Sequence, residues 1–264
     1  MLAPAALPEH YHQWNHTHGA PFGRPIPRKR ILDYFLRAKS PEQLSGPFSI
    51  QSNNTTREYE YPWAFESAKL TSGMRVLDLG GSLCGFQFVL DKSGCQVINV
   101  DPGTDAKGVG WPCDLTSIEK LNHLFGTHVE LRNCTIENAN LCENGIDRAF
   151  SISVVEHLTD ADIANVMNHV HRCLKPGGLF VLTIDLFLNL YPFCSRIHNE
   201  YGRNQDIRLM IELGNWEIVE GNTEQLFGFE LFNADAVLSN LEKYLIGQYY
   251  PALIQCLVLR KRLT

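Results

Sequence analysis

The sequence lacks any apolar run long enough to cross a membrane, since a spanning helix needs about 20 consecutive apolar residues. Its first residues hold no basic segment, and prolines interrupt their apolar part, so no signal peptide is predicted. The eight cysteines form no Cys-x-x-Cys pair, and we expect free, mostly buried thiols. Together these absences predict a soluble cytoplasmic protein with no membrane association.

Positive charge is also scarce, because the formal net charge is -6 and the basic clusters at residues 24–30 and 260–262 are short. A protein that grips a phosphate backbone needs a concentrated basic surface. We therefore expect no nucleic-acid partner.

Along the sequence, apolar runs alternate with helical patterns. Five apolar runs are typical of buried strands. The first begins near residue 74, and the others span 96–101, 128–132, 147–153 and 179–184, with helical patterns between them. Two more runs follow at 216–219 and 254–259, and a helix is expected at 234–245. This pattern predicts an α/β fold: a doubly wound, mostly parallel sheet of about seven strands with helices on both faces.

The predicted organisation has three parts. An N-terminal arm or lid spans residues 1–60, the main domain spans 61–264, and a substrate-capping insert follows the fifth strand at about 186–214. The arm is expected to be irregular except for a short helix at 31–38. Its closely spaced histidines could bind a metal, but no cysteine or carboxylate joins them, so a solvated arm is favoured and no metal site is assigned. These histidines are His10, His12, His16 and His18.

The most informative stretch is 76–85, where a buried strand breaks into Gly80-Gly81-Ser82 and then resumes as a helix. Glycine permits a tight turn there and lets a ligand approach the main chain. Asp101 ends the next strand, 21 residues after Gly80, at the distance expected for a carboxylate that binds a ribose. A nicotinamide dinucleotide is one candidate ligand, but Ser82 replaces the second glycine of its G-x-G-x-x-G motif.

Four ordered motifs favour a different cofactor. They are Val-Leu-Asp-Leu-Gly-Gly at 76–81, the terminal Asp101, the segment 147–158 with its Glu-His-Leu ending, and Leu-Lys-Pro-Gly-Gly at 174–178. As a set, over about residues 57–185, they resemble class I S-adenosylmethionine-dependent methyltransferases. A Rossmann-like domain that binds another ligand is the alternative.

The resemblance implies a site for S-adenosylmethionine, with S-adenosylhomocysteine as the product. Asp78 and Gly80 correspond to the turn around the methionine part, Asp101 to the ribose acid, and Ile136 with Glu137 to the adenine contacts. The implied cofactor residues are Arg57, Asp78, Gly80, Gly81, Ser82, Asp101, Pro102, Asp114, Ile136, Glu137 and Ser153.

The sequence departs from the family pattern at three places. Ser82 and Cys84 replace two glycines of the usual D-x-G-x-G-x-G motif. Thr135 stands where the family has an aspartate after the third strand, so Asp114 is an alternative adenine contact. The third departure is the long loop between the second and third strands, which contains Asp114. Within it, Thr116 is expected to cap a helix, with Glu119 at the capping-box position.

Methyl transfer requires alignment of the reacting groups and sometimes removal of a proton. His157, just past the fourth strand, is the candidate general base, with Glu156 beside it; a purely structural Glu-His pair is the alternative. Asp185 at the end of the fifth strand is a second candidate base or substrate contact, or a helix-capping acid.

The acceptor is expected to be a small molecule, methylated at oxygen or carbon, because the insert is rich in apolar and aromatic residues that could roof a pocket. A protein or RNA methyltransferase and a catalytically silent cofactor-binding module are the alternatives. A monomer and a homodimer are both compatible with the sequence.

Overall fold

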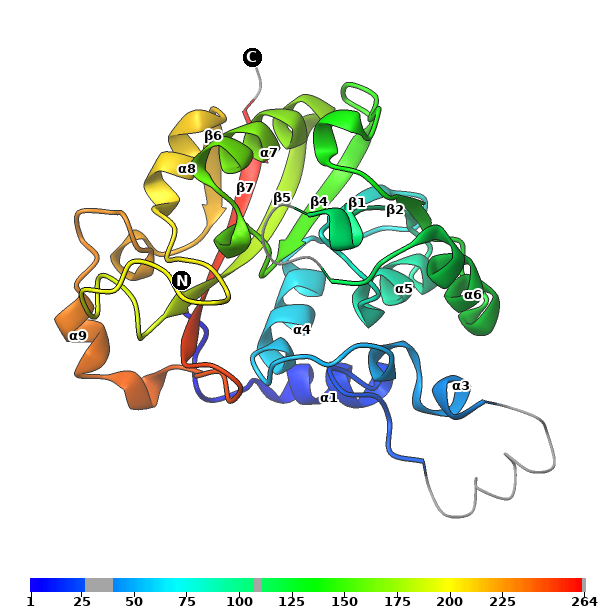
Figure 1. Cartoon of the computed structure of the whole chain (residues 1–264), viewed down its shortest axis with the longest axis horizontal. Helices are drawn as coiled ribbons and strands as arrows, with labels where there is room; N and C mark the ends of the chain where they lie inside the picture. Colours follow the sequence, from blue (N-terminus) through cyan, green and yellow to red (C-terminus); the bar gives the residue numbers. More distant parts are fainter. Residues whose placement is uncertain (27–39, 107–110, 263–264) are drawn as a thin grey trace.

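A computed structural model describes residues 1–26, 40–106 and 111–262. Its centre is a seven-stranded sheet in the order β3-β2-β1-β4-β5-β7-β6 (Figure 1). The strands are β1 Arg75–Leu79, β2 Gln96–Val100, β3 Glu130–Arg132, β4 Ile146–Ile152, β5 Leu174–Phe187, β6 Trp216–Glu220 and β7 Ala252–Lys261. The predicted α/β fold with a mostly parallel sheet is therefore confirmed.

The first five strands run parallel, whereas β7 lies antiparallel between β5 and β6. Asp78 of β1 pairs with Asn99 of β2 and with Phe150 of β4. Because parallel strands finish at one edge of the sheet, this register brings the residues that follow β1, β2 and β4 to a common rim.

Helices cover both faces of the sheet. They are α1 Glu9–His18, α3 Pro41–Ser45, α4 Arg57–Ser67, α5 Gly85–Lys92, α6 Leu115–Phe125, α7 Asp160–Cys173, α8 Ile207–Leu213 and α9 Ala234–Leu238. Alternate strand residues point to opposite faces: Val76 packs with α4, α5 and α6, and Leu77 packs with α7 and α8. The strands are apolar on both faces because each face is covered.

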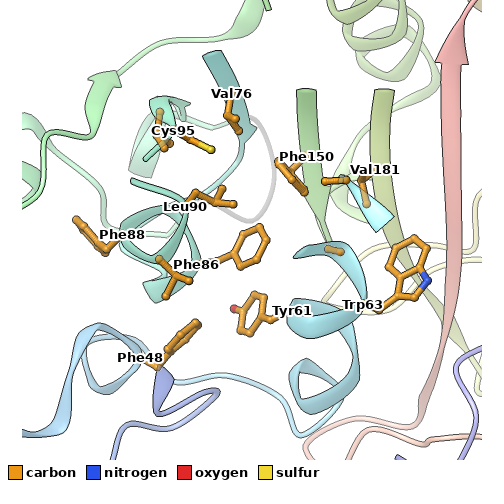
Figure 2. Packing of buried hydrophobic residues seen from close by; sticks show 14 of the residues in the cluster. Phe48, Tyr61, Trp63, Val76, Phe86, Phe88, Leu90, Cys95, Phe150 and Val181 are labelled. Carbon is orange, nitrogen blue, oxygen red and sulfur yellow. The ribbon is translucent and has the colours of Figure 1, made fainter. Parts of the chain in front are cut away.

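The N-terminal segment packs on the core, with α1 and α4 below the strands in Figure 1. The expectation of an irregular arm was wrong at Glu9–His18, which is helical, while the helix expected at 31–38 lies outside the described residues. Figure 2 shows why α4 is fixed, since Tyr61 faces Phe86 of α5. The two rings stack 5.4 Å apart, and Phe48 packs against Tyr61 at 5.1 Å.

Several element boundaries differ from those expected. Strand β5 is longer than 179–184 and continues to Phe187, and the helix expected at 234–245 stops at Leu238. None of the helices in the described ranges has both the length and the apolar character of a membrane span. All eight cysteines are free, as expected, but only four of them are buried rather than most: Cys95, Cys113, Cys173 and Cys256.

Candidate active site

A cavity of about 750 Å³ lies at the carboxyl ends of the parallel strands. Its walls include eleven of the fourteen predicted site residues: Arg57, Asp78, Gly80, Gly81, Ser82, Asp101, Pro102, Ile136, Glu137, Ser153 and His157. Asp114, Glu156 and Asp185 are not on the wall. The topology thus brings residues from five separate stretches of the chain to one cavity.

The turn after β1 is held in a strained but well-supported conformation. Gly80 has φ +69°, and a Cβ atom on Gly81 would lie 2.5 Å from Asp78 Oδ2. Ser82 also has a left-handed φ, +44°, which costs a non-glycine residue about 1 kcal/mol or more. Its carbonyl accepts hydrogen bonds from Gln87 Nε2 (2.9 Å) and Asn99 Nδ2 (3.0 Å). These buried amides explain how the turn tolerates a serine.

Asp101 follows β2 and organises the same turn. Its Oδ2 accepts a hydrogen bond from the Ser82 N–H (2.8 Å), and its Oδ1 accepts one from the Gly103 N–H (2.6 Å). Burial raises the pKa of this carboxyl, and the two backbone donors counteract the effect. Each carboxylate oxygen has a second lone pair, so the side chain can still accept hydrogen bonds from a ligand.

Asp78 lies beneath the turn with only 3% of its surface exposed. Burial, with a smaller contribution from Asp101, raises its pKa to about 7. A carboxyl in such surroundings binds a proton or a cation near neutral pH.

The far end of the cavity is formed by Pro102, Ile136 and Glu137, where Ile136 is buried in the 3-10 helix η3 (Ile136–Asn138). Glu137 Oε2 accepts a hydrogen bond from Asn165 Nδ2 of α7 (2.9 Å). Trp111, which the sequence did not single out as a site residue, joins this wall with 49% of its surface exposed.

Asp114 has a structural role instead. The expectation that Thr116 caps α6 was wrong: Asp114 is the N-cap, and its Oδ1 accepts a hydrogen bond from the Ser117 N–H (2.8 Å). The side chain is exposed and does not line the cavity.

His157 ends the short helix η4 (Val155–His157) that follows β4. Its Nδ1 contacts the carbonyl oxygen of Tyr201, so Nδ1 carries the proton and Nε2 has a free lone pair. Burial lowers the pKa of this imidazole below its ordinary value, and Arg57 also lowers it. Hence the ring is neutral at neutral pH.

Residues of the insert brace the η4 turn. The Arg203 N–H donates to the Glu156 carbonyl (3.1 Å), and Gln205 Nε2 donates to the carbonyls of Val155 and Leu158, both at 3.2 Å. Gly202, with φ +138°, lies so close that a Cβ atom there would be 2.1 Å from the Glu156 carbonyl oxygen.

Glu156 and Asp185 are buried behind the wall. Neither has an exposed surface, and burial raises the pKa of both, that of Asp185 to about 6. Asp185 Oδ1 lies 3.4 Å from Ser153 Oγ, whereas the Glu156 carboxyl has no hydrogen-bond partner among the described residues. In this arrangement neither acid can reach the cavity directly.

Sequence reasoning missed the wall between α4 and the C-terminal part. Tyr201 and Tyr250 line it with their rings 4.5 Å apart, and Asn54 Oδ1 accepts a hydrogen bond from the Gln248 N–H (3.1 Å). These residues are distant in sequence and form no motif.

Glu60 was also missed, although its i+3 spacing from Arg57 on a helix was a usable signal. No three potential metal ligands are grouped in the described ranges.

The fold is a Rossmann-like α/β fold, and comparison with known proteins shows a similarity to methyltransferases. Residues 77–182 match a family model described as a methyltransferase domain. Over this stretch, which is less than half of its length, the chain resembles class I S-adenosylmethionine-dependent methyltransferases.

The relatives match over part of their length. An uncharacterised methyltransferase of Synechocystis is 26% identical over 156 residues, which is 50% of this chain and 66% of the relative. A ubiquinone biosynthesis O-methyltransferase of Rhizobium johnstonii is 30% identical over 124 residues, which is 46% of this chain and 45% of the relative. The chain thus spans less than two thirds of the length of these relatives.

Solved structures share the fold at low identity. The [4+2]-cyclase SpnF has a TM-score of 0.56 at 11% identity, covering 92% of this chain and 98% of its own. The 1,6-didemethyltoxoflavin-N1-methyltransferase of Burkholderia thailandensis has a TM-score of 0.54 at 14% identity, covering 99% and 95%.

Proposed function

We propose that this protein transfers a methyl group from S-adenosylmethionine to a small-molecule acceptor, at oxygen or carbon. The observation that carries the proposal is a single cavity that joins the Asp78, Gly80 to Ser82 and Asp101 turn to the neutral imidazole of His157. One end suits a charged nucleoside, and the other offers a proton acceptor.

The wall residues fit the cofactor in charge and in space. Asp101 would accept hydrogen bonds from the ribose, Asp78 would balance the ammonium group, and Arg57 would bind the carboxylate. The cofactor supplies a methyl group that is already activated on a sulfonium. The turn that would hold the cofactor with Ser82 needs its glycines, because a Cβ atom on Gly80 would lie 2.7 Å from Val154 Cγ2 and one on Gly81 2.5 Å from Asp78 Oδ2. The remaining contacts are assigned to Pro102, Ile136, Glu137 and Ser153.

The space for the acceptor is limited and aromatic. A cavity of about 750 Å³ must hold the cofactor and the acceptor together, which supports a small acceptor. Tyr201 and Tyr250 line its wall with Asn53 and Asn54. A relative named for O-methylation in ubiquinone biosynthesis supports oxygen as the acceptor atom.

His157 is the group that can accept a proton from the acceptor. Its contact with the Tyr201 carbonyl orients the ring, and its lowered pKa keeps Nε2 unprotonated at neutral pH. In this proposal Glu156 and Asp185 act only from behind the wall, because neither lines the cavity.

Two measurements distinguish a methyltransferase from a module that binds the cofactor without catalysing methyl transfer. Calorimetry should detect S-adenosylhomocysteine binding, and incubation with methyl-labelled S-adenosylmethionine and metabolite extracts should yield a labelled small molecule. Binding without label transfer would support the silent module, a relevant outcome because the similar fold of SpnF belongs to a cyclase. Absence of binding would remove the cofactor assignment altogether.

The pH dependence of cofactor binding should report on Asp78. Because its pKa is about 7, the carboxyl is mostly protonated below that pH and becomes a carboxylate above it. If only the carboxylate pairs with the ammonium group, affinity for S-adenosylhomocysteine rises about tenfold from pH 6 to pH 8. Calorimetry across this range should show the rise in the wild type and lose it in Asp78→Asn. An equal pH dependence in both proteins would assign the titration to another group.

A further inference from the structure

Glu60 connects three elements beneath the cavity. It lies on α4, has no exposed surface, and accepts hydrogen bonds through both carboxylate oxygens. Its Oε1 accepts from Ser153 Oγ (2.7 Å) and from Thr183 Oγ1 of β5 (2.6 Å), and its Oε2 accepts from Arg57 Nη1. A single carboxylate therefore ties α4 to the end of β4 and to β5.

The surrounding charges make Glu60 the main partner of the guanidinium. Glu156 and Asp185 are buried nearby, so three carboxyl groups share the surroundings of one arginine. Burying unpaired charges is costly, and one cation cannot balance three anions. Of these three carboxyl groups only that of Glu60 is in ion-pair contact with the guanidinium, so the ion pair is formed by Arg57 and Glu60.

Arg57 retains binding capacity on its cavity side. Nη1 is shared between Glu60 and Ser153, the latter at 2.7 Å, while Nε and Nη2 make no hydrogen bond within the described part of the chain. The guanidinium is a rigid planar fork whose free donors match a carboxylate. Both Arg57 and Ser153 line the cavity, whereas Glu60, which holds them, does not.

We propose that Glu60 is a positioning residue that directs the free edge of the Arg57 guanidinium toward the carboxylate of the cofactor's methionine part. This inference rests on the proposed function. The carboxylate is the anionic group of the cofactor, and Arg57 supplies the complementary charge on this wall. Without Glu60 the long arginine side chain would keep only its hydrogen bond to Ser153, whose hydroxyl is itself held by Glu60.

The test compares two ligands that differ in the group concerned. S-adenosylhomocysteine carries the carboxylate, whereas 5′-methylthioadenosine lacks the amino acid part. In Glu60→Gln, the amide oxygen can still accept from Ser153 and Thr183, but an NH₂ group faces Arg57 in place of a carboxylate oxygen. Calorimetry should show at least about a tenfold loss of affinity for S-adenosylhomocysteine and an unchanged affinity for 5′-methylthioadenosine.

Glu58→Gln is the matched control, since Glu58 is on the same helix and does not line the cavity. It should bind both ligands like the wild type. A Glu60→Gln variant that loses both ligands equally, or neither, would overturn the positioning role. If the wild type binds neither ligand, the proposed function itself fails.

A double variant tests the same proposal if Glu60→Gln does not fold. Arg57→Gln with Glu60→Gln removes both charges and leaves neither buried without its partner. It should show the same selective loss for S-adenosylhomocysteine. Retention of wild-type affinity for that ligand would overturn the proposal, because neither member of the pair would then be needed.

Discussion

Replacing His157 with glutamine should lower the maximal rate of methyl transfer by about a hundredfold, the usual contribution of a general base. The wild-type rate should rise with pH through the lowered pKa of the imidazole and then level, because only the neutral ring accepts a proton. Glutamine keeps a polar side chain of similar reach but has no basic nitrogen. A pH-rate profile for an oxygen acceptor should therefore lose its rising limb in His157→Gln.

Cofactor binding serves as the control for this prediction. The affinity for S-adenosylhomocysteine should be similar in His157→Gln and in the wild type, because the imidazole is assigned to the acceptor. A variant that keeps both the rate and the shape of the pH profile would leave His157 with a structural role only, as an anchor for the Tyr201 carbonyl.

Removing the Asp101 carboxylate should weaken cofactor binding by about a hundredfold, the combined effect of two charge-assisted hydrogen bonds. The loss has two sources in Asp101→Ala. The ribose loses its acceptor, and the N–H groups of Ser82 and Gly103 lose the partner that shapes the turn. Titration calorimetry with S-adenosylhomocysteine would measure the change.

Asp105→Ala is a suitable comparison, since Asp105 is an exposed acid in the same loop that does not line the cavity. It should bind the cofactor like the wild type. Equal affinity in Asp101→Ala and in the wild type would transfer the ribose contact to another residue.

Much of the fold could be predicted because its signals are local. Apolar strands such as 96–101 and glycine breaks such as 80–81 read directly as parallel-sheet elements, and Thr159 is the N-cap of α7 as its position suggests. The same logic failed at Glu9–His18, whose many histidines and low apolar content hide a helix that forms against α4. Tertiary packing, rather than intrinsic propensity, determines that segment.

The cofactor end of the cavity was more predictable than the acceptor end. Asp78 lies near the end of β1 and Asp101 follows β2, so topology alone brings them together. Tyr250 reaches the same cavity from a loop almost 150 residues past Asp101 in the chain, and no motif marks it. Glu156 was predicted as a site residue because it is adjacent to His157 in the sequence. Neighbouring residues after a strand point in different directions, however, and the Glu156 side chain faces inward.

The brace formed by Gly202, Arg203 and Gln205 links two properties that are often treated as separable. These are the lining of the cavity and the position of His157. These residues follow Tyr201 of the cavity wall and support the main chain on which His157 sits. Exchanging this segment to broaden the choice of acceptor would therefore disturb catalysis as well, because any side chain at 202 collides with the Glu156 carbonyl. The wall around Tyr250 is linked to the same turn, because the Tyr250 ring packs 4.5 Å from that of Tyr201, whose carbonyl contacts His157. A substitution at Tyr250 is therefore also expected to shift His157.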